Sequence, residues 1–167
     1  LGTTGEANSF STRERLDVIA AAANSGIAKE KLLIGTGCCA PTDTIELTRA
    51  ALDAGFNQIL MLPPFYYKGV SDDGIFASFE HVIQQLADDR LRIVVYDFPL
   101  MTGLDISVDL LVRLNKAYPN TVVGVKDSSG DWPAMQAVIQ AIPGFRMFAG
   151  TEQYLLANLQ EGGAGCI

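Results

Sequence analysis

The sequence predicts an α/β protein built from repeated strand–helix units. Apolar runs alternate with amphipathic segments along all 167 residues. Successive runs lie roughly 25 to 35 residues apart, which is the spacing of βα units. The runs are continuously apolar rather than strictly alternating, which indicates parallel strands covered on both faces. Two architectures have this pattern, the eight-stranded (β/α)8 TIM barrel and the doubly wound sheet.

Five strands and the beginning of a sixth are predicted in chain order. They are KLLIGTG (31–37), NQILMLP (57–63), RIVVYDFP (92–99), TVVGVKD (121–127), FRMFAG (145–150) and the start of GGAGCI (162–167).

Helices are predicted between the strands from capping residues and apolar stripes. The first begins after a capping box formed by Ser11 and Glu14. A second box, formed by Asp43 and Glu46, predicts the start of the next helix. The remaining helices are predicted over 72–87, after the cap Ser107, around Met135 with Pro133 in the first turn, and from about Glu152.

The length suits a single domain, residues 1–167, but it is short for a complete barrel. A (β/α)8 barrel typically takes about 250 residues. The chain opens at LGTTGE and stops just as a strand begins. If the chain forms a barrel, we therefore expect an incomplete one, truncated at both ends.

Composition restricts the partners. The net charge is −7 and no long basic run occurs, which argues against nucleic acid and anionic membranes. No apolar stretch approaches the roughly 18 residues of a membrane span. The cysteines Cys38, Cys39 and Cys166 lack CxxC spacing and predict neither a disulfide framework nor a zinc site. We expect reduced, mostly buried cysteines, a cytoplasmic protein and no metal or cofactor.

Unusual residues follow five successive strand-to-helix turns. These segments are GTTGE (2–6), PPFYYK (63–68), YDFP (96–99), Lys126 and AGTE (149–152). Because the carboxyl ends of parallel strands meet at one edge, we expect these groups on one rim. Taken singly, each has an ordinary explanation. GTTGE can be a plain turn, Tyr66 and Tyr96 can be core aromatics, and Lys126 can pair with Asp127 or Glu152.

Taken together, the segments predict amine chemistry. A buried strand that ends on Lys126 would place its amine in an apolar pocket, which favours the neutral form. Such an amine attacks a ketone to form a Schiff base, which acts as an electron sink. A tyrosine hydroxyl can relay protons, and a glycine turn with threonines can hold a carboxylate.

In this order, GTTGE, the tyrosines of PPFYYK, YDFP and GVKD resemble the dihydrodipicolinate synthase and N-acetylneuraminate lyase family. These are class I, pyruvate-dependent aldolases on a (β/α)8 barrel. The resemblance covers essentially the whole chain, from the end of the second barrel strand to the start of the eighth. It implies pyruvate or another 2-oxo acid plus an aldehyde as substrates. It also implies a homo-oligomer, a homotetramer arranged as a dimer of dimers.

The resemblance also implies catalytic roles. Lys126 would form the Schiff base and Tyr96 would relay protons. Thr3 and Tyr66 would complete a hydroxyl relay, with Tyr66 reaching in from a neighbouring subunit.

Four further residues would bind substrate by the same resemblance. Thr4, together with Thr3, would hold the pyruvate carboxylate, and Gly150 would line the pocket floor. Glu152 and Gln153 match positions that can touch the second substrate.

Two departures from the family pattern bear on the substrate. Met101 stands where dihydrodipicolinate synthases carry an arginine that grips a substrate carboxylate, and Asp97 stands where asparagine is common. Without this arginine, the protein lacks a bidentate partner for a substrate carboxylate, which disfavours an aldehyde that carries one. The sequence thus favours a less acidic or sugar-acid-like partner over the dihydrodipicolinate synthase reaction itself. The alternatives are a non-catalytic 2-oxo-acid-binding relative and a doubly wound nucleotide-binding domain, which lacks a phosphate-binding fingerprint.

Overall fold

The computed structural model describes residues 1–167, and its centre is one parallel sheet of six strands. The strands are β1 (Ile34–Gly35), β2 (Gln58–Met61), β3 (Arg92–Asp97), β4 (Val122–Asp127), β5 (Arg146–Ala149) and β6 (Gly165–Cys166). Each one lies inside a run that the sequence predicts as a strand. The predicted strands are therefore confirmed, with shorter bounds.

The order of the strands across the sheet follows their order in the chain. The sheet runs β1-β2-β3-β4-β5-β6, and every neighbouring pair is parallel. A doubly wound sheet reverses its strand order at a switch point, and no reversal occurs here. This excludes the doubly wound alternative and leaves a parallel half-barrel.

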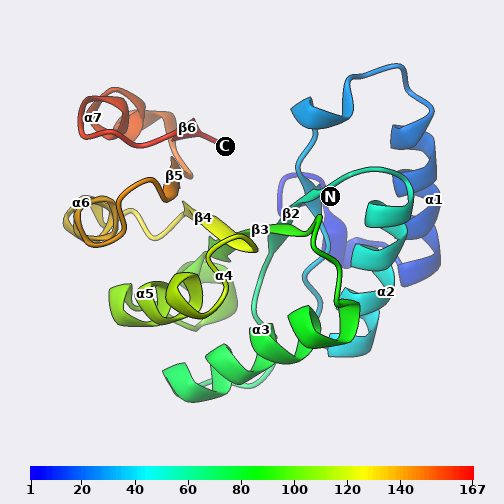
Figure 1. Cartoon of the computed structure of the whole chain (residues 1–167), viewed down its shortest axis with the longest axis horizontal. Helices are drawn as coiled ribbons and strands as arrows, with labels where there is room; N and C mark the ends of the chain where they lie inside the picture. The colour runs from blue at the N-terminus through cyan, green and yellow to red at the C-terminus, as the bar shows by residue number, and fades with distance from the viewer.

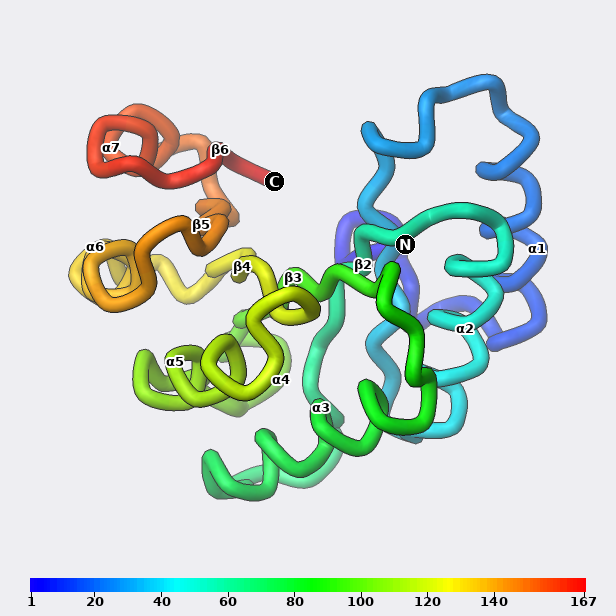
Figure 2. The backbone as a smooth tube through the Cα atoms, in the orientation of Figure 1, coloured from blue at the N-terminus to red at the C-terminus, as the bar shows by residue number.

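One α-helix precedes the first strand, and six more lie between the strands. They are α1 (Thr12–Ala23), α2 (Pro41–Asp53), α3 (Asp72–Leu86), α4 (Pro99–Thr102), α5 (Val108–Ala117), α6 (Trp132–Ala141) and α7 (Leu155–Gln160). Figure 1 shows the longer helices as an arc outside the curved sheet, which faces inward. In Figure 2 both chain termini lie on the inner side of this arc.

The main core fills the space between the sheet and the helices. It contains 28 buried residues, among them Ile59, Ile93 and Val125 from the strands. Because side chains alternate along a strand, their neighbours point to the concave side. There Leu60 and Val94 form a second, smaller buried cluster with Tyr96. The concave side thus carries both apolar support and the residues of interest.

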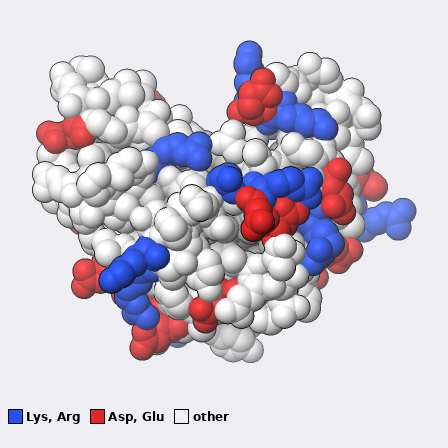
Figure 3. All heavy atoms as spheres, viewed as in Figure 1, with Lys and Arg blue, Asp and Glu red and all other residues white.

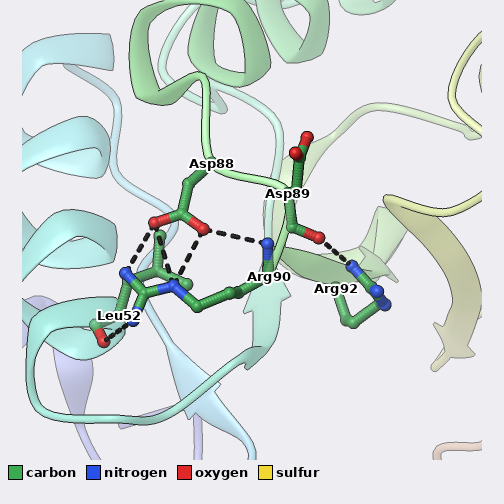
Figure 4. Close-up of polar contacts among 5 residues, drawn as sticks. All are labelled: Leu52, Asp88, Asp89, Arg90 and Arg92. Atoms are coloured by element: carbon green, nitrogen blue, oxygen red, sulfur yellow. Dashed lines mark hydrogen bonds and ion pairs between the residues drawn. The ribbon is translucent and has the colours of Figure 1, made fainter.

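A group of polar contacts holds the edge of the sheet at which β3 begins. This edge is opposite to the one at which the strands end. The guanidinium of Arg90 donates to both oxygens of Asp88, with the closest contact at 2.6 Å, and to the carbonyl of Leu52 (Figure 4). These hydrogen bonds lower the pKa of Asp88 to about 2. The turn between α3 and β3 is therefore tied to the end of α2.

Three sequence expectations need correction. The box of Asp43 and Glu46 does not start α2, because the helix begins two residues earlier at Pro41 with Ala40 as its N-cap. Proline is favoured in a first turn, where its missing N–H costs nothing. The predicted strand 92–99 ends at Asp97, and the short helix α4 follows.

The third correction concerns the cysteines. All three are free, but Cys39 is exposed and the other two are only half-buried. The expectation of mostly buried cysteines was wrong.

No helix in the structure combines the length and apolar character that a membrane crossing requires.

Candidate active site

A hollow of about 600 Å³ opens on the concave side, at the carboxyl ends of the strands. Figure 3, seen from the side where the strands begin, shows the gap between the two ends of the arc. Fifteen residues line the hollow, and Lys126 is the one charged residue among them. No group of three or more His, Cys, Asp or Glu side chains is arranged to hold a metal ion.

Lys126 and Tyr96 occupy paired positions at the ends of β4 and β3. Neighbouring strands lie about 4.8 Å apart, so paired side chains on one face meet. The Lys126 Nζ lies 3.5 Å from the Tyr96 hydroxyl oxygen and 4.5 Å from the centroid of its ring. Tyr96 is 3% exposed, whereas Lys126 is half-buried. The amine is therefore held against a buried phenol and still reaches the hollow.

Thr3 joins this pair from the segment before α1. Its Oγ1 lies 3.1 Å from the Tyr96 hydroxyl oxygen. The GTTGE segment folds into a turn in which the Glu6 N–H donates to the Thr3 carbonyl. Glu6 adopts a left-handed φ of 54°. The turn thus completes a chain of two hydroxyls and one amine from three elements.

The same turn presents unused backbone donors. The N–H groups of Thr4 and Gly5 have no acceptor within the chain, and both residues line the hollow. Successive free N–H groups in a turn form a concavity that favours anions. A carboxylate can therefore be held here, beside Thr3 and opposite Lys126.

Small hydroxylated residues form the other wall, and none of them was expected to have a role, although Thr151 lies in the AGTE segment (149–152). Ser128, Ser129 and Thr151 line the hollow together with Gly150. A Cβ at Gly150 would lie 2.1 Å from the Ser128 Oγ and 2.8 Å from the Asp127 carbonyl oxygen, so only glycine fits. The two serines and the threonine directly follow predicted strands. The expectation that residues after parallel strands meet on one rim therefore applies to them as well.

Four predicted residues lie outside the hollow. Tyr66 is 72% exposed on the loop after β2, and Met101 is 59% exposed on α4. Glu152 and Gln153 are also exposed, in the short 3-10 turn Glu152–Tyr154. The structure thus brings together Lys126 and the residues around it, but not these four.

Two buried carboxyl groups lie on the other face of the strands. Asp97 follows Tyr96, and Asp127 follows Lys126. Burial, and then the charge of Asp127, raises the pKa of Asp97 to about 8. Burial also raises the pKa of Asp127, against hydrogen bonds from Ser129 that lower it.

Comparison with known proteins places this geometry in a family. The model of the dihydrodipicolinate synthetase family matches residues 1–167, and the chain belongs to that family. An uncharacterized DapA-like lyase of Chloroflexus aurantiacus is 39% identical over the whole chain. A 4-hydroxy-tetrahydrodipicolinate synthase of Rhodospirillum centenum is 34% identical, again over the whole chain. The chain spans 55% and 56% of the lengths of these two relatives.

Solved structures agree with this placement. Dihydrodipicolinate synthase from Agrobacterium tumefaciens has a TM-score of 0.94 and 37% identity, covering 99% of this chain and 58% of that one. A prophage protein of E. coli from the same family, solved in complex with pyruvate, has a TM-score of 0.89 and 28% identity. It covers 99% of this chain and 55% of the E. coli chain.

Proposed function

We propose that this protein is a class I aldolase or lyase that forms a Schiff base between Lys126 and pyruvate or another 2-oxo acid. The observation that carries the proposal is the position of the Lys126 amine, 3.5 Å from the buried Tyr96 hydroxyl and inside a hollow with no other charged lining residue. The E. coli relative solved with pyruvate supports the choice of 2-oxo acid.

The chemistry follows from the groups around Lys126. The neutral amine attacks the keto carbon and water leaves, which gives an iminium ion. The iminium withdraws electrons from the neighbouring carbon, so a bond at that carbon can form or break. Lys126 supplies the electron sink itself, and the reaction needs no other cofactor.

Tyr96 and Thr3 would move the protons. Carbinolamine formation and loss of water each need a group that both gives and accepts a proton near the reacting nitrogen. The Tyr96 hydroxyl is within reach of Lys126 Nζ and of Thr3 Oγ1. The 2-oxo acid carboxylate would lie against the free N–H groups of Thr4 and Gly5.

The hollow favours a neutral, hydroxylated aldehyde as the second substrate. The wall opposite GTTGE offers hydroxyls from Ser128, Ser129 and Thr151, and no arginine or second lysine lines it. Met101 carries no charge and lies outside the hollow. An aldehyde with a carboxylate would find no cationic clamp on these residues, which disfavours the dihydrodipicolinate synthase reaction.

The complete active unit is also part of the proposal. We expect a (β/α)8 barrel in which further strands close the sheet, working in the cytoplasm as a homotetramer. Tyr66 is exposed on the rim, where it is available to a second copy. Tyr67 is 78% exposed beside it, so the structure offers two hydroxyls for that role.

Borohydride trapping tests the proposal on the protein at its full natural length. Incubation with pyruvate and borohydride is expected to add a reduced pyruvate group to the peptide that contains Lys126. The Lys126→Met variant should carry no adduct and lose at least about 100-fold in activity. A matched Lys116→Met variant, which changes an exposed lysine on α5, should behave as wild type.

The alternative, a non-catalytic relative that binds 2-oxo acids, predicts a different result. Pyruvate would then raise the melting temperature without leaving an adduct on Lys126. An adduct on another lysine would contradict the assignment of the nucleophile.

A further inference from the structure

Two buried carboxyl groups lie side by side directly behind the candidate site. Asp97 and Asp127 are paired in register between β3 and β4. Because successive side chains point to opposite faces of a sheet, both carboxyls lie on the convex side while Tyr96 and Lys126 face the hollow. Asp97 is 7% exposed and Asp127 is 4% exposed.

No cation compensates this pair. None of the three ion pairs in the structure involves either carboxyl. The charged groups that act on Asp97 are the carboxylates of Asp127 on β4 and Asp105 before α5. Asp131, the N-cap of α6, adds a further negative charge near Asp127.

The hydrogen bonds of the two carboxyls are unequal. Asp127 Oδ1 accepts from the backbone N–H of Ser129 at 2.8 Å and from its hydroxyl. Asp97 Oδ1 is buried and has no hydrogen-bond partner, and burial, which raises the pKa of this carboxyl, acts more strongly than the backbone N–H of Ile106, which lowers it. A buried oxygen without a donor is far more costly in a charged carboxylate than in a neutral carboxylic acid. The proton therefore belongs on Asp97.

We propose that Asp97 and Asp127 act as one unit that retains a single proton at neutral pH, and that this proton holds Tyr96 and Lys126 in position. Two like charges buried side by side cannot both form without a large cost. With one proton present, the ends of β3 and β4 stay together. Asp97 and Asp127 are positioning residues, since neither touches the hollow.

Backbone contacts connect the pair to the wall of the hollow. The Asp97 carbonyl accepts the Ser128 N–H at 2.8 Å, and the Asp127 carbonyl accepts the Gly150 N–H at 2.7 Å. When both carboxyls ionise, repulsion separates the two strand ends. That movement shifts Ser128 and Gly150 and lengthens the contact between Lys126 and Tyr96.

The pH dependence has a definite sign. Burial raises the pKa of Asp97 in the folded protein to about 8, from an ordinary pKa of 3.8. Between these two values the unfolded chain binds fewer protons than the folded one. The free energy of unfolding therefore falls as pH rises through this window, and the loss is complete above about pH 8.

Melting curves of Asp97→Asn test the pair without reference to catalysis. Asparagine has nearly the shape of the neutral acid and cannot ionise. We expect wild type to lose melting temperature between pH 5 and pH 8.5, and the variant to lose at least about 4 °C less. A matched Asp105→Asn variant, which removes the exposed neighbour, should keep most of the wild-type decline. If the melting temperatures of wild type and Asp97→Asn fall equally with pH, the proposal of a shared proton is overturned.

The positioning role rests on the proposed function, and its readout is the pH profile of kcat. The ratio of Asp97→Asn to wild-type kcat with pyruvate is expected to rise at least threefold between pH 7 and pH 9.5. A flat ratio with altered melting curves would show a purely structural pair and overturn the positioning role. If neither protein turns pyruvate over, the proposed function fails, while the melting curves still decide whether the proton is shared.

Discussion

At the scale of single residues, the candidate site depends on how closely Gly150 approaches the end of β4. Its N–H donates to the Asp127 carbonyl, and the Ser128 hydroxyl occupies the space that a side chain would need. The floor of the hollow is therefore defined by the absence of a side chain at this one position.

We predict that Gly150→Ala destabilises the protein by about 1 to 3 kcal/mol, because a methyl group overpacks the site. Activity should fall with it, since Ser128 must move. Urea unfolding midpoints measure the stability change. Gly2→Ala is the matched control, because its Cβ would meet only Leu60 Cδ2 at 3.9 Å, an ordinary contact. Equal effects of the two substitutions would contradict the overpacking argument.

Lys126 and Tyr96 could be predicted from the sequence, and Thr3, Thr4 and Gly150 were expected beside them and do line the hollow, but the buried carboxyl pair behind them could not be predicted. Lys126 and Tyr96 were found because each ends a buried strand, and parallel strands place such ends together. The pairing of Asp97 with Asp127 depends on the register between β3 and β4, which no local pattern reports. The partner of Tyr66 cannot be read from one chain, because it belongs to a second copy in the proposed assembly.

At the scale of the elements, α3 and α5 are joined through a shared cap. Ser107 accepts the Leu110 N–H as the N-cap of α5, and its hydroxyl donates to Asp72 in the first turn of α3. One small side chain thus serves two helices.

Ser107→Ala is predicted to lower the free energy of unfolding by about 2 kcal/mol, because it removes a cap and a charge-assisted hydrogen bond. Ser71→Ala is the comparison, since Ser71 caps α3 alone and is exposed. We expect about 1 kcal/mol or less for that change. Chemical denaturation of both variants measures the difference, and an equal loss would mean that the contact with Asp72 contributes nothing.

Element boundaries were predictable where the signal was local. The box of Ser11 and Glu14 was predicted and is present in full. The box of Asp43 and Glu46 failed because Pro41 starts α2 earlier, so a capping pattern was overridden by a stronger start signal. The helix α4 has only four residues, which is too short for any periodic pattern to indicate.

At the scale of the whole molecule, the exposed aromatic loop after β2 bears on assembly. Tyr66 and Tyr67 extend from the rim with more than 70% of each side chain exposed. Large exposed aromatics on one loop are typical of surfaces that meet another molecule.

Mixing two inactive variants tests whether Tyr66 acts in a neighbouring copy. Tyr66→Phe and Lys126→Met are each expected to lose at least about tenfold in activity, because proton transfer or the nucleophile is missing. Exchange of subunits should then restore roughly a quarter of the sites, by pairing an intact lysine with an intact tyrosine. Tyr67→Phe in place of Tyr66→Phe tests the other hydroxyl. A mixture that stays inactive with both tyrosine variants would exclude a contribution in trans.

The contact between Asp88 and Arg90 lies at the start of β3, whereas Tyr96 lies near its carboxyl end. β3 therefore carries this supporting contact at one end and a residue of the candidate site at the other. A change of loop sequence around Phe98 or Ser128 leaves the supporting contacts at the far rim untouched. Such an arrangement lets selection alter the substrate by small steps while the fold persists. Under the proposed function, the turns after β3 and β4 are the natural place to randomise when new aldehyde acceptors are sought.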